Sequence, residues 1–231
     1  MKYLVIGLLC FSSVAQAQSF KRVHRKAIMA DSHNDLLTAS IEKNVLIDQD
    51  LKGKTHSDLN RFKEAGVDVQ LFSVWCDGDK LQPYAWANRE IDTLYAVAKR
   101  NPEKIEIVPN YDALKKAVRN SKLAAMFGVE GGHMIEDDIN KIDSLYKRGV
   151  RYMTLTWNNS TSWASSAMDE TKLNNDPSAK LGLNDFGKQV VKRMNQLGMM
   201  VDLSHVGEKT FWDAIQTTTK PILVSHSNAY A

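Results

Sequence analysis

Apolar and polar positions alternate in blocks along this chain, and the blocks predict strands and helices in turn. Short apolar runs bounded by polar residues predict strands over residues 27–33, 67–75, 105–108, 123–129, 150–156, 199–203 and 221–224. Apolar residues at helical spacing predict helices over residues 55–64, 84–100, 111–119, 135–148, 184–197 and 208–217. Strands that alternate with helices indicate an α/β protein whose parallel sheet or barrel is covered on both faces.

Several boundaries of these elements carry their own signals. Thr55 or Ser57 is a candidate cap for the first helix, and the second helix stops before Pro102. Gly149 closes the helix over 135–148, as glycine does at many helix ends. Residues 158–183 are rich in Ser, Thr, Asn and Ala, and they predict a long surface loop.

The N-terminus has the pattern of a secretory signal peptide over residues 1–17. Lys2 precedes a mostly apolar run, and Ala15-Gln16-Ala17 has the small-x-small form of a cleavage site. The apolar run is shorter than the roughly 20 residues of a membrane-spanning helix. We therefore expect export, to the periplasm or the cell exterior if the source is bacterial, and a single domain over residues 18–231.

Composition excludes several classes of protein. The 231 residues are 43% hydrophobic and 25% charged, which is typical of a globular domain and excludes long disorder. A formal net charge of +3 is too small to indicate a nucleic-acid partner or a membrane-surface partner. Removal of the signal peptide takes Cys10 with it and leaves Cys76 alone, so we expect no internal disulfide.

Five side chains with metal-binding chemistry lie where predicted strands end. They are His33, Asp35, Glu130, His205 and His226. In a parallel barrel the carboxyl ends of the strands meet on one face, where active sites are built. Imidazole nitrogens and carboxylate oxygens are donors that zinc accepts. The pattern therefore favours a metal site, although a single histidine at a strand end is more often structural.

Other chemically active residues have ordinary explanations. His24, His56 and His133 are interpreted as structural by default. Ser204 and Ser225 each precede a histidine, but no Gly-x-Ser-x-Gly turn accompanies them, so a serine hydrolase is not indicated. Cys76 ends a predicted strand and is open to a nucleophilic role, but we rank a structural role higher.

Five segments, in the same chain order, resemble the membrane dipeptidase (renal dipeptidase) family of zinc peptidases, family M19. They are Asp31–Leu36, Gly128–His133, Tyr152–Thr156, Asp202–Val206 and Ser225–Tyr230. The resemblance runs over essentially the whole chain after the signal peptide. It implies a (β/α)8 TIM-barrel metallo-dependent hydrolase with two zinc ions that cleaves dipeptides, and it also suggests a homodimer.

The resemblance assigns roles to the five strand-end residues. His33 and Asp35 are expected to bind the first zinc ion, and His205 and His226 the second. Glu130 is expected to bridge both ions and to be catalytic. A hydroxide held between the ions would attack the scissile carbonyl, because metal binding lowers the pKa of water. The resemblance thus implies a secreted zinc-dependent dipeptidase.

The chain departs from the family pattern at Trp157. Animal members have a histidine there, directly after Thr-Leu-Thr, and it contacts the substrate carbonyl oxygen. Tryptophan donates one N–H and cannot titrate. Asn158 or Asn159 is a possible substitute donor, so we take Trp157 and Asn158 as candidate substrate-binding residues.

A second departure is the end of the chain at Ala231. Family members continue with an Arg that holds the substrate carboxylate and an Asp that handles the proton. Six or so strands cannot close an eight-stranded barrel. We therefore expect a barrel that is C-terminally incomplete in this chain, with weak or no activity from the 231 residues alone.

Two other functions fit parts of the pattern. An amidohydrolase-type enzyme acting on a cyclic amide on the same barrel would typically have a His-x-His pair after the first strand, whereas this chain has His33-Asn34-Asp35. A binding protein that kept the barrel and lost the chemistry would explain Trp157, but not the five retained ligands.

Overall fold

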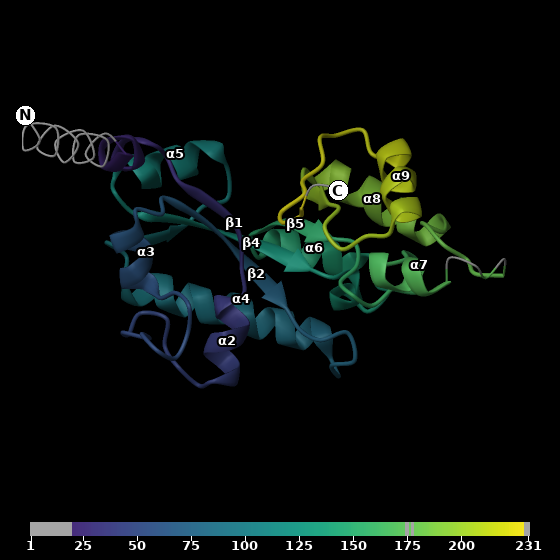
Figure 1. Ribbon diagram of the computed structural model, residues 1–231, viewed down its shortest axis with the longest axis horizontal. Helices are drawn as coiled ribbons and strands as arrows, with labels where there is room; N and C mark the ends of the chain where they lie inside the picture. Colours follow the sequence, from purple (N-terminus) through teal and green to yellow (C-terminus); the bar gives the residue numbers. More distant parts are fainter. Residues whose placement is uncertain (1–19, 174–175, 177, 229–231) are drawn as a thin grey trace, which may run out of the picture.

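Six parallel strands form a half-barrel in the order β1-β2-β4-β5-β6, with β3 paired to β4 off this path (Figure 1). The structure is a computed structural model that describes residues 20–173, 176 and 178–228. The strands are β1 (Ala30–Asn34), β2 (Val69–Trp75), β3 (Ile105–Ile107), β4 (Leu123–Glu130), β5 (Val150–Thr154) and β6 (Met200–Asp202). β2 pairs with β4 along its whole length, so β3 and β5 share the opposite edge of β4. The expected signal peptide, residues 1–17, lies outside the described residues.

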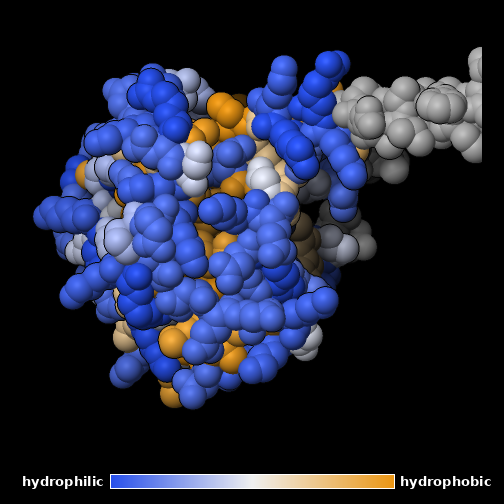
Figure 2. All heavy atoms as spheres, turned by 90° about the vertical axis from the view of Figure 1, so that its left-hand side faces the viewer, coloured by the Kyte–Doolittle hydropathy of each residue, from blue (hydrophilic) through white to orange (hydrophobic). Residues whose placement is uncertain are grey.

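Helices pack against the strands of the sheet. They are α2 (Leu36–Glu42), α3 (Leu59–Ala65), α4 (Pro83–Arg100), α5 (Tyr111–Arg119), the 3-10 helix η1 (Gly132–Ile135), α6 (Asn140–Lys147), α7 (Ala167–Leu173), α8 (Asp185–Leu197) and α9 (Glu208–Thr217). α2 and α4 pack on β2, α5 packs on β4, α6 on β5 and α8 on β6. Figure 2 shows that the face on the left of Figure 1 is mainly hydrophilic, with small hydrophobic areas between. Among the residues that the structure describes, no helix combines the length and apolar character needed to cross a bilayer.

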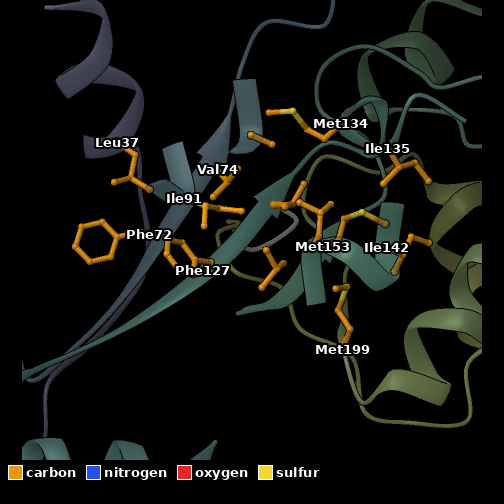
Figure 3. Packing of buried hydrophobic residues seen from close by; sticks show 14 of the residues in the cluster. Leu37, Phe72, Val74, Ile91, Phe127, Met134, Ile135, Ile142, Met153 and Met199 are labelled. Carbon is orange, nitrogen blue, oxygen red and sulfur yellow. The ribbon is translucent and has the colours of Figure 1, made fainter. Parts of the chain in front are cut away.

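The core follows from the alternation of side chains along β4. Successive side chains of a strand point to opposite faces of the sheet. Ala125, Phe127 and Val129 are fully buried in the main core, where they join Phe72 of β2 and Ile91 of α4 (Figure 3). The apolar run that predicted this strand is therefore the layer that packs against the helices.

The opposite face of β4 carries a glycine, Gly128, and then the carboxylate of Glu130 at the end of the strand. A Cβ atom at Gly128 would lie 1.7 Å from Cζ of the buried Tyr152, so glycine is needed for the ring to cross the strand. Glu130 stands two residues further along and therefore on the same face. Gly128 lets the Tyr152 ring pack directly on this face of β4. The carboxylate of Glu130 then stands at the carboxyl end of the strand.

The structure corrects the expected helix boundaries near the N-terminal strands. The helix predicted over 55–64 begins later, at α3, and neither Thr55 nor Ser57 caps it. The carboxylate of Asp58 does so, because it accepts hydrogen bonds from the N–H groups of Asn60 and Arg61. α2 was not expected; Asp35 occupies its N-cap position but makes no side-chain capping bond.

Three further differences lie in the second half of the chain. The helix predicted over 135–148 is η1 followed by α6, because Glu136 and Asp137 between them have φ angles of 48° and 56°. The segment 158–183, expected as a loop, contains α7. The strand predicted over 221–224 is reduced to one parallel bridge, between Leu223 and Asp202.

Candidate metal centre

Five side chains meet at the carboxyl end of β4. Glu130, the last residue of that strand, is only 3% exposed. Its Oε2 lies 3.3 Å from His33 Nε2, and its Oε1 lies 2.9 Å from His205 Nε2 and 3.5 Å from His226 Nε2. His33 Nε2 also lies 3.2 Å from Asp35 Oδ1. The structure thus brings together all five residues that the strand-end pattern singled out.

The local backbone explains how distant segments reach one point. His33 lies on β1, and Asp35 follows two residues later, which puts both side chains on the same side of an extended segment. His205 follows β6 with a φ of 61°, a left-handed conformation that is costly for a residue other than glycine. His226 comes just after Leu223, which bridges to β6. A strained backbone kept beside converging polar groups is typical of a functional site.

The charges in this cluster depend on one another. Burial by itself would lower the pKa of His33, but hydrogen bonds to Asp35 and Glu130 outweigh burial and raise that pKa to about 10. Burial would raise the pKa of Glu130, but hydrogen bonds from His205 and His33 lower it to about 2. Burial and the nearby His33 charge lower the pKa of His226. Glu130 is therefore a buried carboxylate that requires positive charge beside it.

The donor set fits a divalent metal ion. One ligand atom from each of His33, Glu130 and His226 lies within 4.8 Å of the other two. The Nε2 atoms of His205 and His226 lie only 2.8 Å apart, and two such nitrogens need a proton or a metal ion between them. Imidazole nitrogens combined with carboxylate oxygens are the ligands of zinc sites. The residues present therefore suit the metal chemistry that their positions predicted.

A family signature covers nearly the whole sequence. The sequence model of the membrane dipeptidase family, peptidase family M19, matches residues 17–231. The chain belongs to this family. The five candidate metal ligands thus lie inside the matched region.

Solved structures share the fold of this membrane dipeptidase family member. The probable dipeptidase PvdM from Pseudomonas aeruginosa superposes with a TM-score of 0.79 at 22% identity, covering 91% of this chain and 55% of that one. A metallo peptidase from Rhodobacter sphaeroides, liganded with a phosphinate mimic of the dipeptide L-Ala-D-Ala, superposes with a TM-score of 0.76 at 20% identity. This match covers 87% of this chain and 65% of that one. An amidohydrolase from Pseudomonas aeruginosa superposes with a TM-score of 0.67 at 22% identity, covering 89% of this chain and 55% of that one. The chain therefore spans between 55% and 65% of the length of these proteins.

The cluster opens into a pocket of about 470 Å³, a volume that suits a small ligand. Trp75 and Trp157 form one wall of it, with ring centroids 5.0 Å apart and planes at 64°. Glu42 and Lys43 of the α2 region also line it. Trp157, a candidate substrate-binding residue from the sequence, therefore lies beside the candidate metal ligands.

Asn158, the other candidate, takes a different position. Its Oδ1 lies 3.2 Å from Nδ1 of His205, on the side of the ring away from Glu130. It lines a neighbouring pocket of about 620 Å³ together with Asp77 and Asp79. A substrate contact by Asn158 stays a prediction, and the contact that the structure gives is with His205, one of the candidate metal ligands.

Sequence reasoning did not identify three residues that support the site. Trp75 ends β2 as Glu130 ends β4, so its position at a strand end was an available signal. Glu90 on α4 and Asp202 at the end of β6 are both 0% exposed, and their roles depend on partners distant in the sequence. Each is a carboxylate inside an apolar helical or strand pattern, and Asp202 also begins one of the segments that resemble the family.

Three residues that were interpreted as structural, Cys76, His133 and His24, have structural surroundings. Burial raises the pKa of the Cys76 thiol to about 12, so it holds its proton at neutral pH and is a poor nucleophile. Nε2 of His133 lies 3.1 Å from the carbonyl oxygen of Cys76. Nε2 of His24 lies 2.8 Å from the carbonyl oxygen of Ala65.

Proposed function

We propose that the protein is a zinc-dependent dipeptidase that hydrolyses the peptide bond of dipeptides. The observation that carries the proposal is the convergence of His33, His205 and His226 on the buried Glu130, with Asp35 beside His33. Membership of the membrane dipeptidase family supports the same reaction class. The phosphinate dipeptide mimic bound by the Rhodobacter sphaeroides metallo peptidase is consistent with it.

The five ligands divide naturally into two groups around one carboxylate. His33 and Asp35 would hold one ion, His205 and His226 would hold a second, and Glu130 would serve both, because its two oxygens face different histidines. Two divalent ions held this way act as Lewis acids that lower the pKa of bound water and polarise a substrate carbonyl. Zinc is the metal that we propose, since the donors are nitrogen and oxygen atoms.

The chain itself supplies binding and orientation. The wall formed by Trp75 and Trp157 offers an apolar surface to a substrate side chain and keeps water from that side of the pocket. Lys43 adds a cationic side chain to those that line the pocket. The pocket therefore combines apolar and charged surfaces next to the ligands, as expected for a small zwitterionic substrate.

The test uses the full-length protein, stripped of metal with a chelator and then reloaded with zinc. Free dipeptides, including pairs with a C-terminal D-residue, are expected to be hydrolysed only after reloading. A cyclic amide such as dihydrouracil is expected to stay intact. Turnover of the cyclic amide would support an amidohydrolase-type enzyme instead, and zinc binding without hydrolysis of any dipeptide would support a binding protein.

We also propose that the protein is exported by the signal peptide over residues 1–17. N-terminal sequencing of the native protein is expected to begin near Gln18. An N-terminus at Met1 would contradict cleavage.

The homodimer implied by the family resemblance belongs to the same proposal, and the mass of the native particle in solution tests it.

A further inference from the structure

The outward-facing nitrogens of two metal-ligand histidines have partners of their own. His205 and His226 direct Nε2 toward Glu130, and their Nδ1 atoms point away from it. Nδ1 of His226 lies 3.0 Å from Oγ of Ser225, and Nδ1 of His205 lies 3.2 Å from Oδ1 of Asn158. A neutral imidazole carries one proton, so these partners decide which nitrogen holds it.

The partner of His226 is itself fixed by a buried carboxylate. Asp202 is 0% exposed. Its Oδ1 accepts from the backbone N–H of Ser204 and of Ser225, at 3.1 and 3.0 Å. Its Oδ2 accepts from the hydroxyls of Thr154 and Ser225, each at 2.6 Å. Both oxygens are thus surrounded by donors, and this leaves the carboxylate as an acceptor only.

The direction of the next hydrogen bond follows from counting protons. The Ser225 hydroxyl has one proton, and it donates this proton to Asp202. Toward His226 the same oxygen can only accept, so Nδ1 of His226 must carry the proton. Nε2 of His226 is then left with a free lone pair, which faces Glu130.

The same reasoning applies to His205 with a different partner. The side-chain oxygen of Asn158 is a pure acceptor, so Nδ1 of His205 must donate to it. The Asn158 carbonyl oxygen of the main chain accepts from the hydroxyl of Ser166, which anchors the residue. Nε2 of a neutral His205 then carries no proton, and its lone pair lies 2.9 Å from Glu130 Oε1, an approach that a cation between the two atoms makes favourable.

We propose that Asn158 and the Asp202–Ser225 pair are positioning residues that hold His205 and His226 in the Nδ1–H tautomer. This orientation presents both Nε2 lone pairs to a metal ion at Glu130. The bound metal ion and the consequence for catalysis rest on the proposed function, whereas the partners of the two Nδ1 atoms are a property of this chain. Partners of this kind typically change metal affinity by about 10- to 100-fold when removed.

The first test is nitrogen-15 NMR of the full-length, zinc-loaded protein with labelled histidine. His205 and His226 are expected to show a protonated Nδ1 and an unprotonated Nε2. A protonated Nε2 on either residue would overturn the proposal for that residue. This measurement needs no substitution, so it stands even if a variant fails to fold.

The second test measures zinc affinity by competition with a chromophoric chelator. Asn158→Leu and Ser225→Ala are each expected to bind zinc about 10- to 100-fold more weakly. Asn158→Asp keeps the acceptor oxygen and is expected to retain the affinity, as is Ser227→Ala, which changes an exposed neighbour. Unchanged affinity in both Asn158→Leu and Ser225→Ala would overturn the proposal. Expected tautomers without dipeptide hydrolysis would refute the proposed function alone.

Discussion

Replacing Glu130 with glutamine is expected to lower kcat/KM for dipeptides by at least about 10³-fold, which corresponds to about 4 kcal/mol of lost transition-state stabilisation. Glutamine has the same size, so the packing at this buried position is kept. It carries no charge, and one oxygen becomes an NH2 group that cannot accept or coordinate. One of the two ligand groups around Glu130 therefore loses its shared carboxylate.

The measurement is steady-state kinetics of the full-length Glu130→Gln protein, together with a metal count by mass spectrometry. The variant is expected to retain less than the full complement of zinc. Glu136→Gln is a matched control, because Glu136 pairs with Lys141 away from the cluster. The control is expected to stay within about twofold of the parent. A Glu130→Gln protein with full zinc and parental kinetics would exclude a metal-bridging role.

The strand that carries Glu130 was predictable from its short, continuous apolar run. Residues 123–129 are apolar throughout, as expected for a strand buried on both faces, and the structure extends it by one residue to Glu130. The helix over 208–217 was also predicted with its observed ends. In both cases local pattern and tertiary packing favour the same structure.

α2 was not predicted, although the sequence carries a start signal for it. Its N-cap position is Asp35, a residue type that usually signals a helix start. Here the carboxylate lies against His33 instead of capping the helix. The sequence therefore carries the usual residue type for a helix start, although in the folded chain its carboxylate contacts His33.

The site was predictable as a set of ligands but not as a network. Parallel strands bring their carboxyl ends together, and this rule alone placed His33, Glu130 and His205 near one another. The bond from His205 to Asn158 spans 47 residues, and no local spacing encodes it. A hydrogen-bond partner of a ligand histidine, such as Asn158, depends on side-chain directions that only the folded chain fixes.

Outside the candidate metal ligands, the largest effect of pH on the free energy of unfolding is expected from Glu90. This side chain is 0% exposed, and its oxygens accept from the Thr38 hydroxyl at 2.6 Å and from the Trp75 backbone N–H at 2.8 Å. Burial raises its pKa to about 8, from an ordinary value of 4.5, and the two hydrogen bonds only partly oppose that. The folded protein therefore binds one proton more at Glu90 than the unfolded chain does between these two values.

The free energy of unfolding is expected to fall as pH rises from about 4.5 to about 8, because ionising Glu90 is harder in the folded state. The total loss is several kcal/mol, at roughly 1.4 kcal/mol per pKa unit. Glu90→Gln resembles the protonated acid: its oxygen can accept from Trp75, and its NH2 group can donate to Thr38. Urea unfolding at pH 5, 6, 7 and 8 should show the variant gaining stability relative to the parent at each step. The exposed Glu103→Gln is the matched control, and a Glu90→Gln difference that stays constant with pH would mean that Glu90 ionises near its ordinary value.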